Sequence, residues 1–198
     1  MKYSVSALVL GFFAAPLPAL SQLFIDGITY AGSGCKAGSV AVTLGFPKLT
    51  LAFDSYVASI GPGVPFVEKY KSCNLNVNIH YPPGYQYTLY MIDYTGFADL
   101  QGGVSASQTS RYWFAGFPPG VTFRTKFAGP YTNTYSFTDT LASESLVWSP
   151  CDASTTLNIN TQLLLSSTNP GSFGLISNLD IQNSKQLIIY GMKLQKCT

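Results

Sequence analysis

Charged residues are scarce in this chain. Lysine, arginine, aspartate and glutamate make up only 10% of its 198 residues, and the formal net charge is +2. The positive charges are scattered, with Lys69 and Lys71 the nearest approach to a cluster. Binding of nucleic acid or of anionic lipid depends on a concentrated basic surface. The sequence therefore predicts no nucleic-acid partner and no electrostatic attachment to a membrane.

Motifs for catalysis and metal binding are also missing. The chain has a single histidine, His80, and no G-x-S-x-G motif that would supply a nucleophile for it to activate. The residue spacings typical of zinc and calcium sites are also absent. No metal and no cofactor is therefore predicted. Asp93 and Asp99 are the acidic pair considered for glycoside hydrolysis, because they flank Tyr94-Thr95-Gly96, a segment typical of a turn. A pair that only stabilises this turn is the favoured interpretation.

The N-terminus has the layout of a secretory signal peptide. Lys2 precedes an apolar run from Ala7 to Ala15, and Ala19-Leu20-Ser21 fits a cleavage site. We expect residues 1–21 to be removed and residues 22–198 to form a single domain. No apolar tail follows Cys197, so no lipid anchor is expected at the C-terminus. The predicted location is extracellular.

The four cysteines are expected to form two disulfides, as an even count in a secreted chain indicates. They are Cys35, Cys73, Cys151 and Cys197. Three connectivities are possible. The favoured one joins neighbours in the chain, Cys35 with Cys73 and Cys151 with Cys197, although spacing alone does not fix it.

Strict alternation marks the stretch CNLNVNIHYPPG at residues 73–84. Period two places alternate side chains on opposite faces of a strand. The apolar face is predicted to be Leu75, Val77, Ile79 and Tyr81, and the wet face Asn74, Asn76, Asn78 and His80. Pro82-Pro83-Gly84 ends the strand, and an apolar run from Tyr85 to Tyr94 follows. The pattern predicts a β-hairpin.

Alternation returns in the segments 49–53, 121–127, 131–140 and 157–165, and turn residues separate them. The final run, from Gln186 to Leu194, is apolar on both faces, which is typical of a central strand. Segment 98–110 is interpreted as a loop or a weak edge strand, and Trp113 and Trp148 as core residues. The sequence therefore predicts an all-β fold, an antiparallel β-sandwich stabilised by two disulfides.

Six segments occur in an order that resembles a family of secreted fungal and bacterial proteins catalogued as a domain of unknown function. They are AGSGCKAGSV at 31–40, LAFDSYVASIGPG at 51–63, KSCNLNVNIHYPPGY at 71–85, DYTGFADLQGG at 93–103, VWSPC at 147–151 and LNINTQLLL at 157–165. Lys36 stands where proline commonly follows the first cysteine of the family. The resemblance implies secretion, a compact domain and paired cysteines, and it transfers no activity or site.

The asparagines on the wet face have two interpretations. They can keep an outer surface solvated without charge, or they can form a recognition face, because amides donate to and accept from sugar hydroxyls. The candidate ligand-binding residues are Asn74, Asn76, Asn78 and His80, with Tyr85 or Tyr90 as an aromatic platform. Such an uncharged face is expected to bind a neutral polymer almost independently of salt.

Three functions remain open at this point. The first is a non-enzymatic secreted protein that binds an extracellular polysaccharide or a host surface component. The second is a secreted hydrolase acting on glycans, and the third is an effector or elicitor recognised by a host. The lack of a catalytic constellation favours the first.

Overall fold

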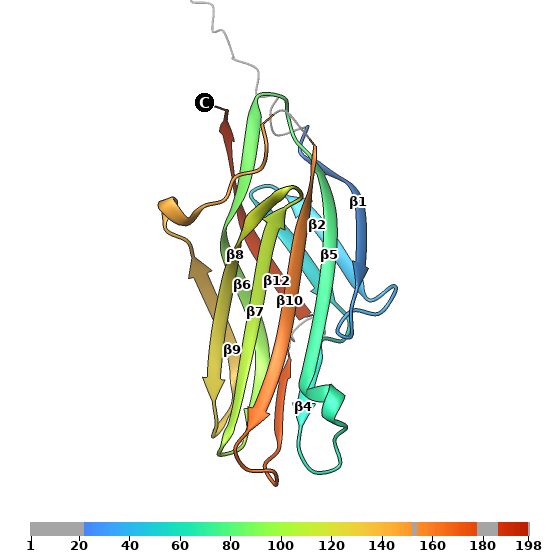
Figure 1. Cartoon of the computed structure of the whole chain (residues 1–198), viewed down its shortest axis with the longest axis vertical. Coiled ribbons are helices and arrows are strands. Elements are labelled where there is room, and N and C mark those ends of the chain that lie inside the picture. The colour runs from blue at the N-terminus through green and yellow to red at the C-terminus, as the bar shows by residue number, and fades with distance from the viewer. Residues whose placement is uncertain (1–21, 152–153, 178–185, 198) are drawn as a thin grey trace, which may run out of the picture.

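Two antiparallel β-sheets pack against each other in the computed structural model, which describes residues 22–151, 154–177 and 186–197 (Figure 1). Sheet A has the spatial order β1 (Phe24–Ala31), β5 (Tyr70–His80), β10 (Thr155–Ser167), β7 (Val104–Phe114) and β8 (Phe117–Ala128). The predicted all-β sandwich is confirmed. The predicted signal peptide, residues 1–21, lies outside the described residues.

Sheet B contains the strands that were not assigned to sheet A. Its order is β2 (Val40–Gly45), β3 (Lys48–Phe53), β12 (Gln186–Lys196), β6 (Tyr85–Leu100), β11 (Gly174–Ser177) and β4 (Val57–Ile60). A further strand, β9 (Tyr131–Thr140), pairs with β6. The short 3-10 helices η2 (Phe66–Lys69) and η3 (Ser143–Ser145) lie in connections. The apolar run at the C-terminus forms a central strand as predicted, because β12 pairs with both β3 and β6.

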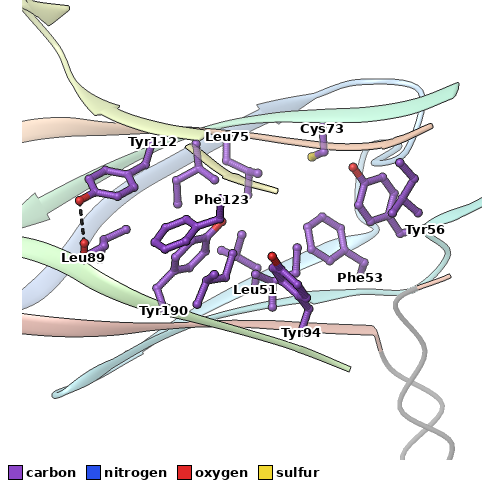
Figure 2. Packing of buried hydrophobic residues seen from close by; sticks show 14 of the residues in the cluster. Leu51, Phe53, Tyr56, Cys73, Leu75, Leu89, Tyr94, Tyr112, Phe123 and Tyr190 are labelled. Carbon is purple, nitrogen blue, oxygen red and sulfur yellow. Dashed lines mark hydrogen bonds between the residues drawn. The ribbon is translucent and has the colours of Figure 1, made fainter. Parts of the chain in front are cut away.

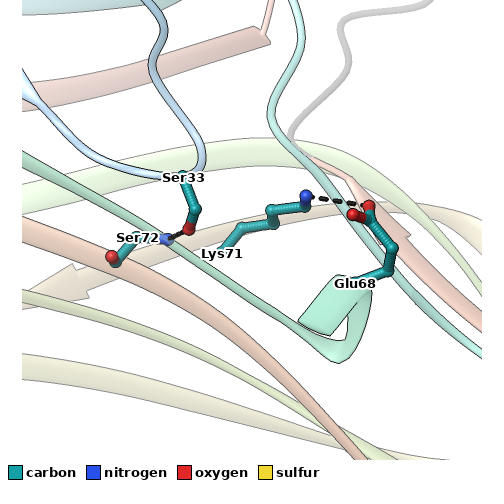
Figure 3. Close-up of polar contacts among 4 residues, drawn as sticks. All are labelled: Ser33, Glu68, Lys71 and Ser72. Carbon is teal, nitrogen blue, oxygen red and sulfur yellow. Dashed lines mark hydrogen bonds and ion pairs between the residues drawn. The ribbon is translucent and has the colours of Figure 1, made fainter. Parts of the chain in front are cut away.

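Both predicted disulfides are present, with the favoured pairing. Cys35 is bonded to Cys73, with 5.5 Å between the Cα atoms, and Cys151 to Cys197, with 6.1 Å. Cys73 lies on β5, and the loop that carries Cys35 docks against the same strand. The Gly34 N–H donates to the Ser72 carbonyl at 2.9 Å. The Ser72 N–H donates to the Ser33 hydroxyl at 3.1 Å, the bond drawn in Figure 3. The loop and the disulfide together fix this end of β5.

The predicted hairpin between residues 73–81 and 85–94 is wrong. β5 belongs to sheet A and β6 to sheet B, so the chain crosses from one sheet to the other at Pro82-Pro83-Gly84. Gly84 has a φ of 78°, in the left-handed region that favours glycine. Each strand buries one face, and the crossing brings these faces together in the core. A pattern of two apolar runs around a turn does not distinguish this arrangement from a hairpin.

The assignment of residues 98–110 to a loop or weak edge strand is also wrong. Residues 98–100 end β6, and residues 104–110 begin β7, an inner strand of sheet A. The inward positions of β7 include Gln108 and Ser110, which are fully buried and polar. These residues hide the alternation that marks the other strands.

The predicted facing of β5 is confirmed. Leu75, Val77 and Ile79 are at most 1% exposed, and they contribute to one core cluster between the sheets (Figure 2). Burial of such side chains stabilises a fold by about 1.5–3 kcal/mol each. The intervening asparagines are exposed on the outer face of sheet A.

Tyrosine hydroxyl groups connect the two sheets inside this core. The Tyr112 hydroxyl on β7 donates to the Leu89 carbonyl on β6 at 2.6 Å (Figure 2). The Tyr94 hydroxyl on β6 bonds to the Thr125 hydroxyl on β8 at 2.9 Å. Three further links join Tyr190 to Ser110, Tyr135 to Gln108, and Thr161 to Tyr56. A buried hydroxyl without a partner would cost about 1–3 kcal/mol, so these bonds allow tyrosine to fill the core.

Tyr87 is the exception among the described tyrosines of the core. Its ring is fully buried and packs edge-on against Tyr81 and Phe114, with centroids 5.2 Å apart in each pair. Its hydroxyl has no hydrogen-bond partner among the described residues. Tyr87 therefore contributes packing while its polar atom is left unpaired.

Tyr112 and Tyr87 form a matched pair for testing the contribution of these hydroxyls. Tyr112→Phe removes the bonds to the Leu89 carbonyl and to the Thr88 hydroxyl, so we expect the free energy of unfolding to fall by about 1–2 kcal/mol. Tyr87→Phe removes an unpaired hydroxyl, so we expect no loss and a gain of up to about 1 kcal/mol. Urea denaturation followed by tryptophan fluorescence measures both. Equal losses in the two variants would contradict this assignment.

Alkaline pH should unfold the protein cooperatively. Burial raises the pKa of Tyr56, Tyr94 and Tyr190 above the ordinary 10.0, and it raises the pKa of Tyr87, Tyr112 and Tyr135 in the same way. A raised pKa in the folded state gives stability that is complete below pH ~10 and is lost as pH rises, because only the unfolded chain then ionises. Each such group adds up to about 1.4 kcal/mol per pH unit to this loss between its unfolded and its folded pKa.

Denaturation curves at a series of pH values check this expectation. Between pH ~8 and ~9.5 the free energy of unfolding should be flat with respect to tyrosine ionisation, and above pH ~10.5 it should collapse. A stable fold at pH ~11.5 would show that the buried tyrosines do not resist ionisation as their surroundings require.

Candidate functional site

The predicted asparagine face lies on the outer surface of sheet A, and β10 extends it. The register of β10 against β5 places Asn160 opposite Asn74, Asn158 opposite Asn76, and Thr156 opposite Asn78. We define the amide face as the six amide residues of these two strands: Asn74, Asn76, Asn78, Asn158, Asn160 and Gln162. All six side chains are exposed or half-buried.

Cross-strand hydrogen bonds order the amide face. The Asn160 amide donates to the Asn74 carbonyl oxygen at 2.6 Å, and Asn76 donates to the Oδ1 atom of Asn158. The Thr156 hydroxyl donates to Asn78 at 2.6 Å, and Gln162 donates to Asn160 at 2.6 Å. A side-chain amide has two donor hydrogens and an oxygen with two acceptor sites, so one or two bonds fix each group and leave further capacity toward solvent.

His80 lies at one end of the amide face. Its ring stacks on Phe24 of β1 with 4.7 Å between the centroids, and its Nδ1 atom is 3.4 Å from the Ser154 hydroxyl. A hydrolytic triad also needs an acid that orients the histidine. No hydrogen bond or ion pair joins His80 to a carboxylate among the described residues.

The two predicted tyrosine platforms do not lie beside the asparagines. Tyr85 and Tyr90 are on β6, which belongs to the other sheet. Tyr90 lies under the Lys193 ammonium group, 4.7 Å from the ring centroid, and Tyr85 pairs with Lys196 at the end of β12. The chain crossing after β5 is the physical reason, because it sends the next strand to the opposite side of the sandwich.

Trp113 supplies the aromatic surface that the tyrosines do not. It is half-buried on β7, opposite Asn158, whose amide donates to the Trp113 carbonyl at 3.5 Å. The prediction that Trp113 and Trp148 belong to the core is wrong, since neither is part of the buried cluster. Trp148 lines a separate hollow of about 560 Å³ with Phe46 and Leu146.

A hollow of about 330 Å³ joins Trp113 to the amide face. Three amide residues line one side of it, and Trp113 with two arginines lines the other; the lining is Asn74, Thr109, Arg111, Trp113, Thr122, Arg124, Asn160 and Gln162. A second hollow, of about 470 Å³, lies over Asn76, Asn78 and Thr156 near β1. The amide face therefore lies along two open hollows on one side of the sandwich.

Gly120 positions the aromatic end of the site. A Cβ atom at this position would lie 2.5 Å from the Tyr112 carbonyl oxygen and 3.0 Å from the Trp113 Cβ atom. Only glycine lets β8 approach β7 this closely, next to a bulge in the register of the two strands. Nothing in the sequence identified Gly120, because it follows Pro118-Pro119 and resembles any turn glycine.

The acidic pair considered for glycoside hydrolysis does not converge. Tyr94-Thr95-Gly96 is part of the middle of β6 rather than a turn, which places Asp93 and Asp99 about 20 Å apart along the strand. Each accepts a hydrogen bond from β9, Asp93 from Thr138 at 2.6 Å and Asp99 from Thr132 at 2.7 Å. Paired glycosidase carboxylates lie within about 10 Å of each other. Both the turn and the pairing are therefore wrong.

The described part of the chain contains neither a cluster of metal ligands nor a membrane-spanning helix. Within residues 22–151, 154–177 and 186–197, no three histidine, cysteine or acidic side chains gather closely enough to hold a metal ion. Over the same ranges, no helix has the length and apolar character needed to cross a membrane.

Two single substitutions test the direction of the hydrogen bonds in the amide face. Asn76→Asp places a carboxylate against the Asn158 oxygen, so we expect the free energy of unfolding to fall by about 1 kcal/mol at pH 7. Asn78→Asp keeps the oxygen that accepts from Thr156, so we expect a change within about 0.5 kcal/mol. Thermal and urea denaturation measure both variants.

The loss in Asn76→Asp should disappear below pH ~4, because the introduced carboxyl is disfavoured in its charged form and can donate once protonated. Equal stability of the two variants at pH 7 would mean that the Asn158 amide turns freely and that its bond to the Trp113 carbonyl does not hold it.

Comparison with known proteins identifies relatives of this chain. A family model described as a domain of unknown function, DUF4360, matches residues 21–197. An uncharacterized secreted protein of Arthroderma benhamiae is 40% identical over 186 residues, which is 93% of this chain and 75% of the relative. The predicted secreted location agrees with this relative and is confirmed.

Solved structures resemble the chain only distantly. A structure of TmCBM61 in complex with beta-1,4-galactotriose is 10% identical, with a TM-score of 0.28 over 87% of this chain and 90% of the other. The enzymatically active domain of bacteriophage CBA120 tailspike protein 4 is 14% identical, with a TM-score of 0.30 over 85% of this chain and 20% of the other. TM-scores this low carry no argument about function. The family match and the A. benhamiae relative establish that the chain belongs to the DUF4360 family of secreted proteins, a domain of unknown function.

Proposed function

We propose that this protein binds a polysaccharide, without cleaving it, through the amide face and Trp113. The observation that carries the proposal is the row formed by Asn76, Asn158 and Trp113, in which two mutually bonded amides continue directly into a half-buried aromatic side chain. Sugar rings present hydroxyls at their edges and apolar C–H groups on their faces. In this row the amides can hydrogen-bond to the hydroxyls, and the Trp113 ring can pack against the C–H face.

The hydrogen bonds among the amides favour this function. Cross-strand bonds hold the side chains of Asn74, Asn76 and their partners on β10 in fixed orientations before any ligand binds. A ligand then meets ordered donors and acceptors, which reduces the entropy lost on binding. Solvation alone would not require partners in register on two strands.

The shape of the surface favours a chain rather than a single sugar. The hollow beside Trp113 and the hollow over Asn76 and Asn78 have volumes of about 330 and 470 Å³ and lie along the same amide face. Alternate residues on a strand are about 7 Å apart, so the positions from Asn74 to Asn78 extend over about 14 Å. A ligand that contacts both hollows is therefore longer than one sugar ring.

Non-catalytic binding is part of the proposal. The carboxylates Asp93 and Asp99 are on the other sheet, where each is bound by a threonine of β9. The amide face itself contains neutral amides, which are poor general acids and bases near neutral pH. The surface is suited to holding a polymer.

The experiment is a binding assay of the secreted protein, with its disulfides intact, against a panel of soluble and insoluble polysaccharides: chitin, β-glucan, galactan, methyl-esterified pectin and polygalacturonate. Trp113→Ala should weaken binding to the polymer that the parent protein binds by about tenfold or more, as truncation of a central interface tryptophan does. The double variant Asn76→Thr, Asn158→Thr keeps two strand-forming side chains and removes two amides, so it should also bind more weakly.

Matched controls come from the other sheet. Tyr90→Ala truncates a half-buried aromatic residue on β6, and Asn133→Thr removes an exposed asparagine on β9, and both should bind as the parent does. If the parent bound no polysaccharide, or if the controls and the site variants lost binding equally, the proposal would fail. Release of new reducing ends by the parent would overturn the non-catalytic part.

A further inference from the structure

Both arginines of the chain lie at the same hollow. Arg111 and Arg124 are the only two arginines in the sequence, and all other basic side chains apart from His80 are lysines. Arg111 is on β7 opposite Thr122, and Arg124 is on β8 opposite Thr109, so the two are diagonal neighbours on the outer face. Both are exposed and line the hollow that contains Trp113.

Local contacts hold each guanidinium group. The Arg111 guanidinium carbon lies 5.3 Å from the centroid of the Trp113 ring, a cation–π distance. The Arg124 Nε donates to the Thr109 hydroxyl at 3.3 Å. These contacts use one face of the first group and one N–H of the second. The remaining N–H donors stay available to a ligand.

No acidic residue of the surrounding strands neutralises these groups. The strands β5, β7, β8 and β10 contain no aspartate or glutamate, and Asp26 on β1 is at the opposite edge of the sheet. Among the described residues, the one ion pair is Lys71 with Glu68, 2.8 Å apart near η2 (Figure 3). Lys126 adds a third positive charge to the outer face of β8. The surface on β7 and β8, beside the uncharged amide face, is therefore positively charged.

We propose that this hollow binds the carboxylate of a uronic acid, so that the preferred ligand is an acidic polysaccharide. The inference rests on the proposed function and specifies its ligand. The planar fork of arginine matches a planar carboxylate, and two forks side by side provide donors to both oxygens. Trp113 packs on the sugar ring, while Asn74, Asn160 and Gln162 contact its hydroxyls.

Polygalacturonate and its fully methyl-esterified form test the charge, because they share one backbone and differ only in the carboxylate. We expect the parent protein to prefer polygalacturonate, and the preference to shrink as salt is raised from 20 to about 500 mM, where the Debye length falls below about 5 Å. Arg111→Gln and Arg124→Gln should each weaken binding to polygalacturonate by about fivefold, the upper range for an exposed ion pair. Binding to the ester should fall by a smaller factor in both variants, because the ester offers no carboxylate for the guanidinium groups to pair with.

Two further variants separate the geometry from the charge. The double variant Arg111→Lys, Arg124→Lys keeps both charges without the forks, so it should bind polygalacturonate more weakly than the parent. Lys193→Gln, on sheet B, removes one charge away from the site and should bind as the parent does. Isothermal titration calorimetry of each protein with oligomers of both forms gives the affinities.

The possible failures are distinguishable. If the parent binds neither form nor any other polysaccharide, the proposed function fails. If it binds both forms equally at every salt concentration, the amide face binds a neutral polymer and the acidic ligand is wrong. Tighter binding to a sulfated galactan than to polygalacturonate would overturn the assignment of a carboxylate.

Discussion

Hydrogen bonds between tyrosine hydroxyls and the opposite sheet constrain how the two sheets of this sandwich fit together. Apolar contacts between two sheets tolerate sliding, because they depend on area rather than direction. A hydroxyl at the end of a ring must meet one particular atom, as Tyr112 meets the Leu89 carbonyl. Five such links, on strands β6, β7, β8, β9, β10 and β12 and at Tyr56 between β3 and β4, fix the relative position of the sheets. The strands of each sheet then have one definite position relative to the strands of the other sheet.

The same register determines which side chains lie on the outer surface. Trp113 points outward because its neighbour Tyr112 points inward, and Arg111 follows by the same alternation. Asn158 reaches Trp113 because β10 is held between β5 and β7 with no shift in pairing. A displacement of β7 by one residue would bury the tryptophan and expose a tyrosine. The order of the candidate site is therefore a consequence of hydrogen bonds in the core.

The sequence was sufficient to predict which face of a strand is buried. It was insufficient to predict which strands lie side by side. Alternation in residues 74–81 predicted which side chains of β5 are buried, because burial on one face of a strand is a local property. It did not predict that Asn76 meets Asn158, a residue 82 positions away, since strand pairing is set by the whole fold. The predicted placement of Tyr85 and Tyr90 beside the asparagines was wrong for the same reason, because a turn that crosses between sheets and a hairpin turn look alike in sequence. Polar inward residues such as Gln108, which bonds to a tyrosine, made β7 resemble a loop or a weak edge strand instead of an inner strand.

The place of β12 has a consequence for how the chain is assembled. This strand follows the other described strands in the sequence, yet it lies between β3 and β6 in the middle of sheet B. Until it arrives, β3 and β6 have open edges, and unpaired edges invite pairing with other chains. The sheet cannot be completed progressively from the N-terminus, as a series of hairpins could be. The sandwich can close only once β12 is present, and the bond from Cys197 to Cys151 secures the strand that closes it.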